Sequence, residues 1–210
     1  MNPQSVFVTG TDTNIGKTVS SALLLKLWGA DYWKPIQCGD LPHSDSKVLQ
    51  GLVGDKHPGS FHPERYAFSM AASPHVAAKE EGVEVRVQDF QLPESSRPLI
   101  VEGAGGCLVP LNDEESILDL AAHLKLPVIL VTRFYLGSFN HSLLSIEAIR
   151  RRGLTLRAVI FNGPDHPEFR QFIVRKANAD FFGQIPEWNQ VDAHSLQALA
   201  QNWEFKKGIS

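Results

Sequence analysis

Two nearly continuous apolar runs, at residues 128–131 and 158–161, constrain the fold more than any other feature of this sequence. Such runs are typical of strands that are buried on both faces of a parallel sheet. Comparable short runs predict strands at 5–9, 31–36, 98–102, 127–132, 156–162 and 181–185. The stretches between them predict helices at 16–27, 45–53, 73–81, 114–124, 140–152, 167–179 and 193–203. This alternation predicts a single α/β domain with a mostly parallel sheet and helices on both faces.

Length and composition limit the class of protein. The chain has 210 residues, so we expect one domain spanning 1–210. A net charge of −3, with arginines clustered only at 150–152, argues against a nucleic-acid-binding module. Two cysteines are too few for a disulfide framework or a structural zinc site. Because neither a signal peptide nor an apolar stretch of roughly 18 residues is present, we expect a cytoplasmic protein that does not enter a membrane. Residues 54–70, rich in Pro, Gly and His, are expected to form a surface loop.

A glycine-rich loop follows the first predicted strand. It begins at Gly10 and ends in Gly16-Lys17-Thr18, and its two glycines are six positions apart instead of the usual five. A strand before the loop and a helix after it are the context that a phosphate-binding P-loop requires. Backbone N–H groups of residues 14–18 would surround phosphate oxygens, Lys17 would reach the β- and γ-phosphates, and Thr18 would ligate Mg²⁺. The loop therefore predicts a P-loop fold that binds a nucleotide.

Three further side chains could complete this site. Glu102 ends a predicted strand and precedes the glycine-rich residues 103–106, where P-loop enzymes place a carboxylate that binds Mg²⁺ or positions water. Lys34 ends another predicted strand, before Pro35, and would stabilise a transferring phosphoryl group or a developing anion. Asp45 suits a metal ligand and a helix N-cap equally well, and its spacing alone does not select between the two.

These residues occur in ordered blocks that resemble one family. The blocks cover residues 8–18, 34–36, 44–45, 73–75, 101–106, 136–137, 140–141 and 153–154. In this order they closely resemble dethiobiotin synthetase, an ATP-dependent enzyme that closes the ureido ring in biotin synthesis. The opening Thr-Gly-Thr-Asp-Thr and the later Glu-Gly-Ala-Gly-Gly are the most specific of these blocks.

The resemblance implies a reaction in three steps and a homodimer. One amine of 7,8-diaminononanoate takes up CO₂, supplied directly or from bicarbonate, to form a carbamate. ATP phosphorylates the carbamate, and the second amine then closes the ring as phosphate leaves. The two subunits share the substrate site, and residues 136–140 hold the substrate carboxylate from across the interface. Without the resemblance, packing of that loop within one subunit would be the simpler interpretation.

The resemblance also implies a role for each matching position. Lys17 and Lys34 would be catalytic, and Thr18, Asp45 and Glu102 would hold Mg²⁺. The nucleotide-binding positions would be Asn14, Ile15, Gly16, Lys17, Thr18, Val19, Asp45, Glu102, Gly103, Ala104, Gly105, Asn162, Gly163, Pro186, Glu187 and Trp188. The substrate-binding positions would be Thr11, Lys34, Cys38, Gly137, Ser138, Phe139 and Asn140. Cys38 stands where the family has serine or threonine, and a thiol donates a weaker hydrogen bond.

Other P-loop proteins are alternatives. A switch or partitioning ATPase that acts on a protein partner often has a second lysine early in its loop, and no lysine occurs between Met1 and Gly16. A GTPase would explain the spacing of Asn162 and Asp165, although Gly163 stands where the guanine-reading signature has lysine. An amide ligase acting on corrin rings would need a glutaminase domain, for which the chain has no room. The preferred base of the nucleotide stays open.

Overall fold

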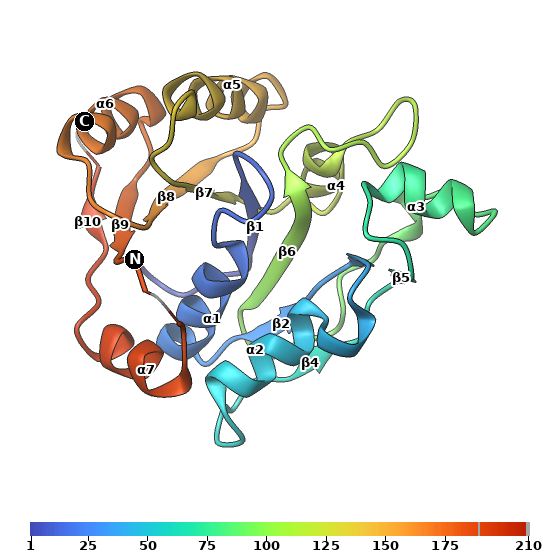
Figure 1. Cartoon of the computed structure of the whole chain (residues 1–210), viewed down its shortest axis with the longest axis horizontal. Helices are drawn as coiled ribbons and strands as arrows, with labels where there is room; N and C mark the ends of the chain where they lie inside the picture. Colours follow the sequence, from blue (N-terminus) through green and yellow to red (C-terminus); the bar gives the residue numbers. More distant parts are fainter. Residues whose placement is uncertain (189, 209–210) are drawn as a thin grey trace.

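The computed structural model describes residues 1–188 and 190–208 and contains a twisted sheet in the strand order β10-β9-β8-β7-β1-β6-β2-β4 (Figure 1). Neighbouring strands are parallel except β9 and β10, which are antiparallel. A separate parallel pair consists of β3 and β5. The strands are β1 (Val6–Gly10), β2 (Asp31–Trp33), β3 (Ile36–Cys38), β4 (Phe61–His62), β5 (Tyr66–Phe68), β6 (Leu99–Gly106), β7 (Val128–Thr132), β8 (Leu156–Asn162), β9 (Phe181–Ile185) and β10 (Lys206–Lys207).

Helices cover both faces of the main sheet, as Figure 1 shows. The helices are α1 (Lys17–Trp28), α2 (Asp45–Val53), α3 (Pro74–Glu80), α4 (Ile117–His123), α5 (Ser138–Arg151), α6 (Pro167–Ala177) and α7 (Ala193–Gln201), with short 3₁₀ turns at Leu41–His43 and Val87–Asp89. One buried apolar cluster joins α1, α2 and α7 to the sheet through residues such as Leu49 and Leu196. A second cluster joins α4, α5 and α6 to the opposite face through Leu118, Ile146 and Ile173. The predicted single α/β domain is confirmed, and the ends of its predicted helices shift by up to three residues.

The prediction of a surface loop at 54–70 is wrong, because this stretch contains β4 and β5. β4 pairs with β2, and β5 pairs with β3. The Asp31 carboxylate accepts hydrogen bonds from the Ser60 N–H at 2.7 Å and from His62 Nε2 at 3.4 Å, which fastens β4 to β2. Strands of two and three residues are too short to produce a periodic pattern in the sequence, so the pattern could not reveal them.

Two predicted strands also have different limits. The strand predicted at 31–36 is divided into β2 and β3, since Lys34 and Pro35 lie between them and proline has no N–H to donate to a ladder. The strand predicted at 98–102 continues to Gly106, so the glycines expected to form a turn belong to β6.

The strand order places β1, β2 and β6 side by side, so the segments that follow them lie at one edge of the sheet. β1 lies between β6 and β7, and β6 lies between β1 and β2. Val8 is paired with Glu102, and Trp33 with Val101. The loop after β1 and Lys34 after β2 therefore lie beside Glu102 of β6, toward the carboxyl ends of adjacent parallel strands, where ligands of such sheets bind. No helix within the described residues has the length and apolar character needed to cross a membrane.

The packing of α1 generates a test of the core. Leu24 is fully buried against the sheet, whereas Leu92 is 42% exposed in a loop. We expect Leu24→Ala to lower the free energy of unfolding by about 2–5 kcal/mol because it leaves a cavity. The matched Leu92→Ala change should lower it by less than about 1 kcal/mol. Urea unfolding followed by circular dichroism measures both, and equal losses would contradict this assignment of the core.

Candidate active site

The phosphate loop connects β1 to α1 and is held from the side by Asn162, at the end of β8. Gly16 is the N-cap of α1 and has a φ of 98°, in the region that favours glycine. A Cβ atom at Gly16 would lie 2.2 Å from Asn162 Nδ2, which donates a hydrogen bond to the Ile15 carbonyl at 3.0 Å. The Ile15 side chain is buried. Position 16 therefore requires glycine, and Asn162 fixes the backbone of the loop.

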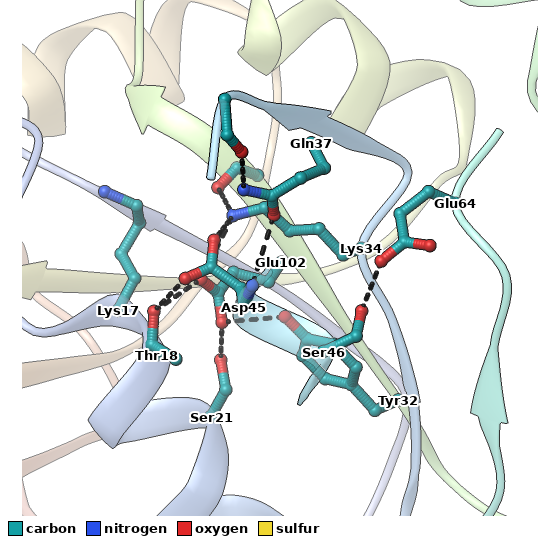
Figure 2. Close-up of polar contacts among 12 residues, drawn as sticks. Lys17, Thr18, Ser21, Tyr32, Lys34, Gln37, Asp45, Ser46, Glu64 and Glu102 are labelled. Atoms are coloured by element: carbon teal, nitrogen blue, oxygen red, sulfur yellow. Dashed lines mark hydrogen bonds and ion pairs between the residues drawn. The ribbon is translucent and has the colours of Figure 1, made fainter. Parts of the chain in front are cut away.

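Lys17 begins α1, and its amine folds back onto the loop. Lys17 Nζ donates a hydrogen bond to the Asp12 carbonyl at 2.9 Å and points away from the carboxylates of Asp45 and Glu102 (Figure 2). Burial lowers the pKa of Lys17, although the negative charge of Glu102 opposes this effect. A phosphate group in the loop would give this amine an anionic partner in place of a backbone carbonyl.

Thr18, Lys34, Asp45 and Glu102 form one connected polar cluster beside the loop (Figure 2). The Thr18 hydroxyl lies 2.9 Å from Asp45 Oδ1 and 3.2 Å from Glu102 Oε1. Lys34 Nζ lies 2.6 Å from Asp45 Oδ2 and 3.2 Å from Glu102 Oε1. The same ammonium lies 3.4 Å from the Gly103 carbonyl. Residues from α1, α2, β6 and the link between β2 and β3 thus converge on one point.

The opposite charges of Lys34 and its two carboxylate neighbours stabilise the ionised form of Lys34 and of Asp45. Burial alone would lower the pKa of Lys34, which is 4% exposed, but the carboxylates of Glu102 and Asp45 raise it above its ordinary value. Burial alone would raise the pKa of Asp45, but the charge of Lys34 and hydrogen bonds from Lys34 and Thr18 hold it below its ordinary value. Lys34 therefore stays an ammonium and Asp45 a carboxylate at neutral pH.

The structure decides between the two readings of Asp45. Ser44 is the N-cap of α2, and Asp45 is the first residue of the helix. Its side chain contacts Thr18 and Lys34, and its N–H donates to Gln37 Oε1 at 3.3 Å. The reading of Asp45 as a helix N-cap is wrong, and its carboxylate belongs to the polar cluster.

A cavity of about 750 Å³ opens over this cluster. The expected site residues among its walls are Asn14, Gly16, Lys17, Thr18, Val19, Lys34, Cys38, Asp45, Glu102, Ala104 and Gly105. Another hollow, of about 910 Å³, lies between α3 and residues 111–115, away from the phosphate loop. The smaller cavity is the candidate active site because the loop, two lysines and two carboxylates line it.

The oxygen atoms in this cavity suit Mg²⁺. Thr18, Asp45 and Glu102 provide one hydroxyl and two carboxylates, which are the hard donors that this cation prefers. Within residues 1–188 and 190–208, no group of three or more His, Cys, Asp and Glu side chains gathers as a denser metal site. A cation held by so few protein oxygens would keep room for phosphate oxygens and water, as Mg²⁺ usually does.

Several residues of the cavity wall were not singled out in the sequence. Thr13 lines the cavity, whereas Thr11 lines a neighbouring hollow and points its hydroxyl at Thr132, 3.5 Å away. Gln37 donates to the Gly39 carbonyl at 3.0 Å while accepting from the N–H of Asp45, so it connects β3 to the start of α2. Its position three residues after Lys34 is the signal in the sequence that could have indicated it.

Cys38 lies at the end of β3 with its side chain half-buried in the cavity wall. Burial raises the pKa of its thiol to about 11. The thiol is therefore protonated at neutral pH and can donate only a weak hydrogen bond to a ligand.

The residues expected to contact the base lie together at a second edge of the loop. Gly163 N–H donates to the Ile185 carbonyl at 3.0 Å, so the segment 186–188 lies beside the end of β8. Glu187 lies 3.8 Å from Arg133, and Trp188 packs against the cluster under α1 and α7. These residues flank the phosphate loop without lining the cavity itself.

The residues expected to hold the substrate carboxylate lie apart from the cavity. Gly137 is the N-cap of α5 with a φ of 98°, and residues 138–140 form the first turn of this helix. None of them lines the cavity of the same chain. Within one chain, the first turn of α5 therefore does not belong to the cavity that contains Lys34 and Glu102.

Comparisons with known proteins show the family of this chain. A family model described as an AAA domain matches residues 4–195. The ATP-dependent dethiobiotin synthetase of Christiangramia forsetii is 42% identical over 99% of this chain and 98% of its own length. The enzyme of the same name from Rhodopseudomonas palustris is 44% identical over 92% of this chain and 91% of its own length. The chain also matches 42% of the biotin biosynthesis bifunctional protein of Bordetella avium, at 41% identity.

A solved structure supports the fold alone. The nucleotide-binding protein from Archaeoglobus fulgidus, determined in complex with ADP, superposes with a TM-score of 0.51 at 12% identity. The match covers 95% of this chain and 87% of that protein. Since the relatives above exceed 40% identity over nearly the whole chain, the protein belongs to the ATP-dependent dethiobiotin synthetase family.

Proposed function

We propose that the protein closes the ureido ring of dethiobiotin by joining CO₂ to 7,8-diaminononanoate with ATP and Mg²⁺. Family membership supports the substrate class and the use of ATP. The main structural support is the position of Lys34, Asp45 and Glu102 beside the phosphate loop, where a phosphoryl group would be transferred. We further propose that the whole chain, 1–210, acts as one domain in the cytoplasm, where its two free cysteines would stay reduced.

The proposed reaction has three balanced steps. One substrate amine bonds to the carbon of CO₂ and loses a proton, which gives a carbamate. A carbamate oxygen then attacks the γ-phosphorus of ATP, and ADP leaves. The second amine attacks the carbonyl carbon of this mixed anhydride and loses a proton. The carbon–oxygen bond to phosphate breaks, which releases inorganic phosphate and leaves the closed ring.

The two lysines would stabilise the negative charge in these steps. Lys34 keeps its ammonium at the base of the cavity, within 3.2 Å of both carboxylates, so it can donate to a carbamate or phosphoryl oxygen placed above it. Lys17 would give up its hydrogen bond to the Asp12 carbonyl and donate to the β- and γ-phosphates instead. Positioning of substrates and stabilisation of charge account for most of the catalysis in phosphoryl transfer.

Thr18, Asp45 and Glu102 would hold the cation. When bound, Mg²⁺ would neutralise the negative charge that develops on the phosphate oxygens. The backbone N–H groups of residues 14–18 would hold the phosphates, and Val19 and residues 103–105 would border them.

We propose ATP as the nucleotide, with its base near Asn162, Gly163 and residues 186–188. The GTPase alternative depends on Asp165, which would have to accept hydrogen bonds from guanine. Arg170 already donates to both oxygens of Asp165, at 2.8 Å and 3.0 Å. Because both carboxylate oxygens of Asp165 already accept from Arg170, this side chain is poorly placed to accept hydrogen bonds from guanine. This favours the ATP-dependent enzyme.

The protein is proposed to act as a homodimer in which α5 of one subunit completes the site of the other. Leu136 is fully exposed beside the start of this helix, and Leu108 and Leu144 are 56% and 53% exposed on the walls of one hollow. Exposed apolar side chains gathered around one helix are typical of a contact surface. The first N–H groups of α5 lack intrahelical acceptors and would hold the substrate carboxylate, with Ser138 and Asn140 adjacent.

The first test is the dependence of ADP release on each reactant. We expect release of ADP and phosphate, together with formation of dethiobiotin, only when diaminononanoate, CO₂ and Mg²⁺ are all present. Coupled ADP detection and mass spectrometry of the product measure this. The Lys17→Ala variant, expected to be at least about 100-fold slower, controls for a contaminating ATPase. ADP release that is unchanged when the diamine is omitted would refute the proposal and favour a switch ATPase acting on a protein partner.

The second test concerns the dimer. A glutamate in place of Leu144 would bury a charge in the proposed contact, so Leu144→Glu should produce monomers in sedimentation equilibrium. Its turnover of diaminononanoate should fall in parallel, while its affinity for ADP stays unchanged. Leu92→Glu, an exposed leucine in another part of the surface, serves as the matched control. A Leu144→Glu monomer with full turnover would contradict a site shared between subunits.

A further inference from the structure

The Glu102 carboxylate receives hydrogen bonds on both of its oxygens, and the two oxygens face different surroundings. Oε1 faces the cavity, where Thr18 Oγ1 and Lys34 Nζ each lie 3.2 Å away. Oε2 faces the interior, where it accepts from Ser21 Oγ at 2.6 Å and from Tyr32 OH at 3.2 Å. The carboxylate is thus divided between a ligand-facing oxygen and an anchored oxygen, as Figure 2 shows.

The two hydroxyls that donate to Oε2 come from two different elements, the helix α1 and the strand β2. Ser21 follows Thr18 by three positions on α1, so both hydroxyls lie on the helix face that is turned to β6. Tyr32 lies on β2, the strand next to β6, and its ring packs against Phe61 with 5.5 Å between the ring centroids. Both side chains are fully buried. Neither contacts the cavity, so neither can bind a substrate directly.

We infer that Ser21 and Tyr32 are positioning residues that hold the Glu102 carboxylate in the orientation needed to bind the cation. A carboxylate can rotate about its terminal bond, and this freedom would let Oε1 leave the cavity. Two donors on Oε2 prevent that rotation without using Oε1. If Thr18 and Lys34 exchange their contacts with Oε1 for contacts with phosphate or substrate, the two hydrogen bonds to Oε2 still hold the carboxylate. The inference rests on the proposed role of Glu102 as a cation ligand.

The test measures cation binding directly. Mn²⁺ is titrated into enzyme with an equimolar amount of ADP, and free Mn²⁺ is followed by electron paramagnetic resonance. A parallel titration of the same ADP without enzyme is subtracted, because ADP in solution also binds Mn²⁺. Partners that orient a metal ligand typically change metal affinity by 10–100-fold, so we expect Tyr32→Phe and Ser21→Ala each to weaken Mn²⁺ binding about tenfold. Tyr32→Phe keeps the buried ring and is the variant expected to disturb the fold least.

Two matched controls separate positioning from a general loss of structure. Ser20 is also fully buried on α1, and its hydroxyl has no hydrogen-bond partner among the described residues, so Ser20→Ala should leave Mn²⁺ affinity unchanged. Tyr66 donates to Asp89 at 3.0 Å in another part of the molecule, so Tyr66→Phe should also leave it unchanged. A double-mutant cycle completes the design: in a Glu102→Gln background, Tyr32→Phe should have no further effect.

The outcomes are distinguishable. If wild-type enzyme binds Mn²⁺ and Tyr32→Phe binds it equally well, the positioning role is overturned while the proposed function stands. A further loss from Tyr32→Phe in the Glu102→Gln background would also overturn it, because the tyrosine would then act through another group. If wild-type enzyme with ADP does not bind Mn²⁺, the proposed cation site fails and the inference fails with it.

Discussion

The Glu102 carboxylate lies buried within β6, and the rest of the candidate active site depends on how its charge is compensated. An isolated carboxylate removed from water is too costly to maintain, so it must have a cation or several hydrogen-bond donors nearby. Here Lys34 supplies the cation, and Thr18, Ser21 and Tyr32 supply hydroxyl donors. Removing one partner of such a pair typically costs about 3–5 kcal/mol. This requirement fixes α1, β2 and the start of α2 around β6.

Charge in this protein is organised locally. The chain as a whole has a net charge of −3, yet the cavity that would accept a polyphosphate contains two ammonium groups and the N-terminus of α1. The two carboxylates beside them would otherwise repel the nucleotide. Their pairing with Lys34 and their suitability for Mg²⁺ explain how one cavity can hold acidic side chains and phosphate together.

Local patterns in the sequence were sufficient for the fold class and for part of the site. Lys17 and Thr18 belong to a contiguous motif, and Glu102 and Lys34 were each predicted to end a strand, so the alternation of strands and helices indicated them as site candidates. In the structure Lys34 follows β2 directly, whereas Glu102 lies within β6, which continues to Gly106. The loop predicted at 54–70 was wrong because β4 and β5 are too short to leave a periodic signal. Ser21 and Tyr32 were missed because their roles arise from contacts with Glu102, which is far from both in the sequence. Gln37 was missed although its partners Gly39 and Asp45 are close in the sequence, because no pattern marks a glutamine that links β3 to α2. The proposed contact of α5 with a second subunit has no signal in the pattern of one chain, so the role proposed for residues 137–140 depends on the resemblance alone.

Lys34, held by Asp45 and Glu102, is the group that we propose to stabilise the phosphoryl transfer. The most direct measurement is single-turnover formation of ADP by Lys34→Met, which keeps an unbranched side chain, one atom shorter, and removes its charge. ADP affinity and circular dichroism are measured on the same samples to establish that the variant folds and binds nucleotide. Our account predicts a fall in the rate of at least about 100-fold with unchanged ADP affinity. A rate within about threefold of wild type would contradict it, since a charge that stabilises the transfer should cost far more when removed.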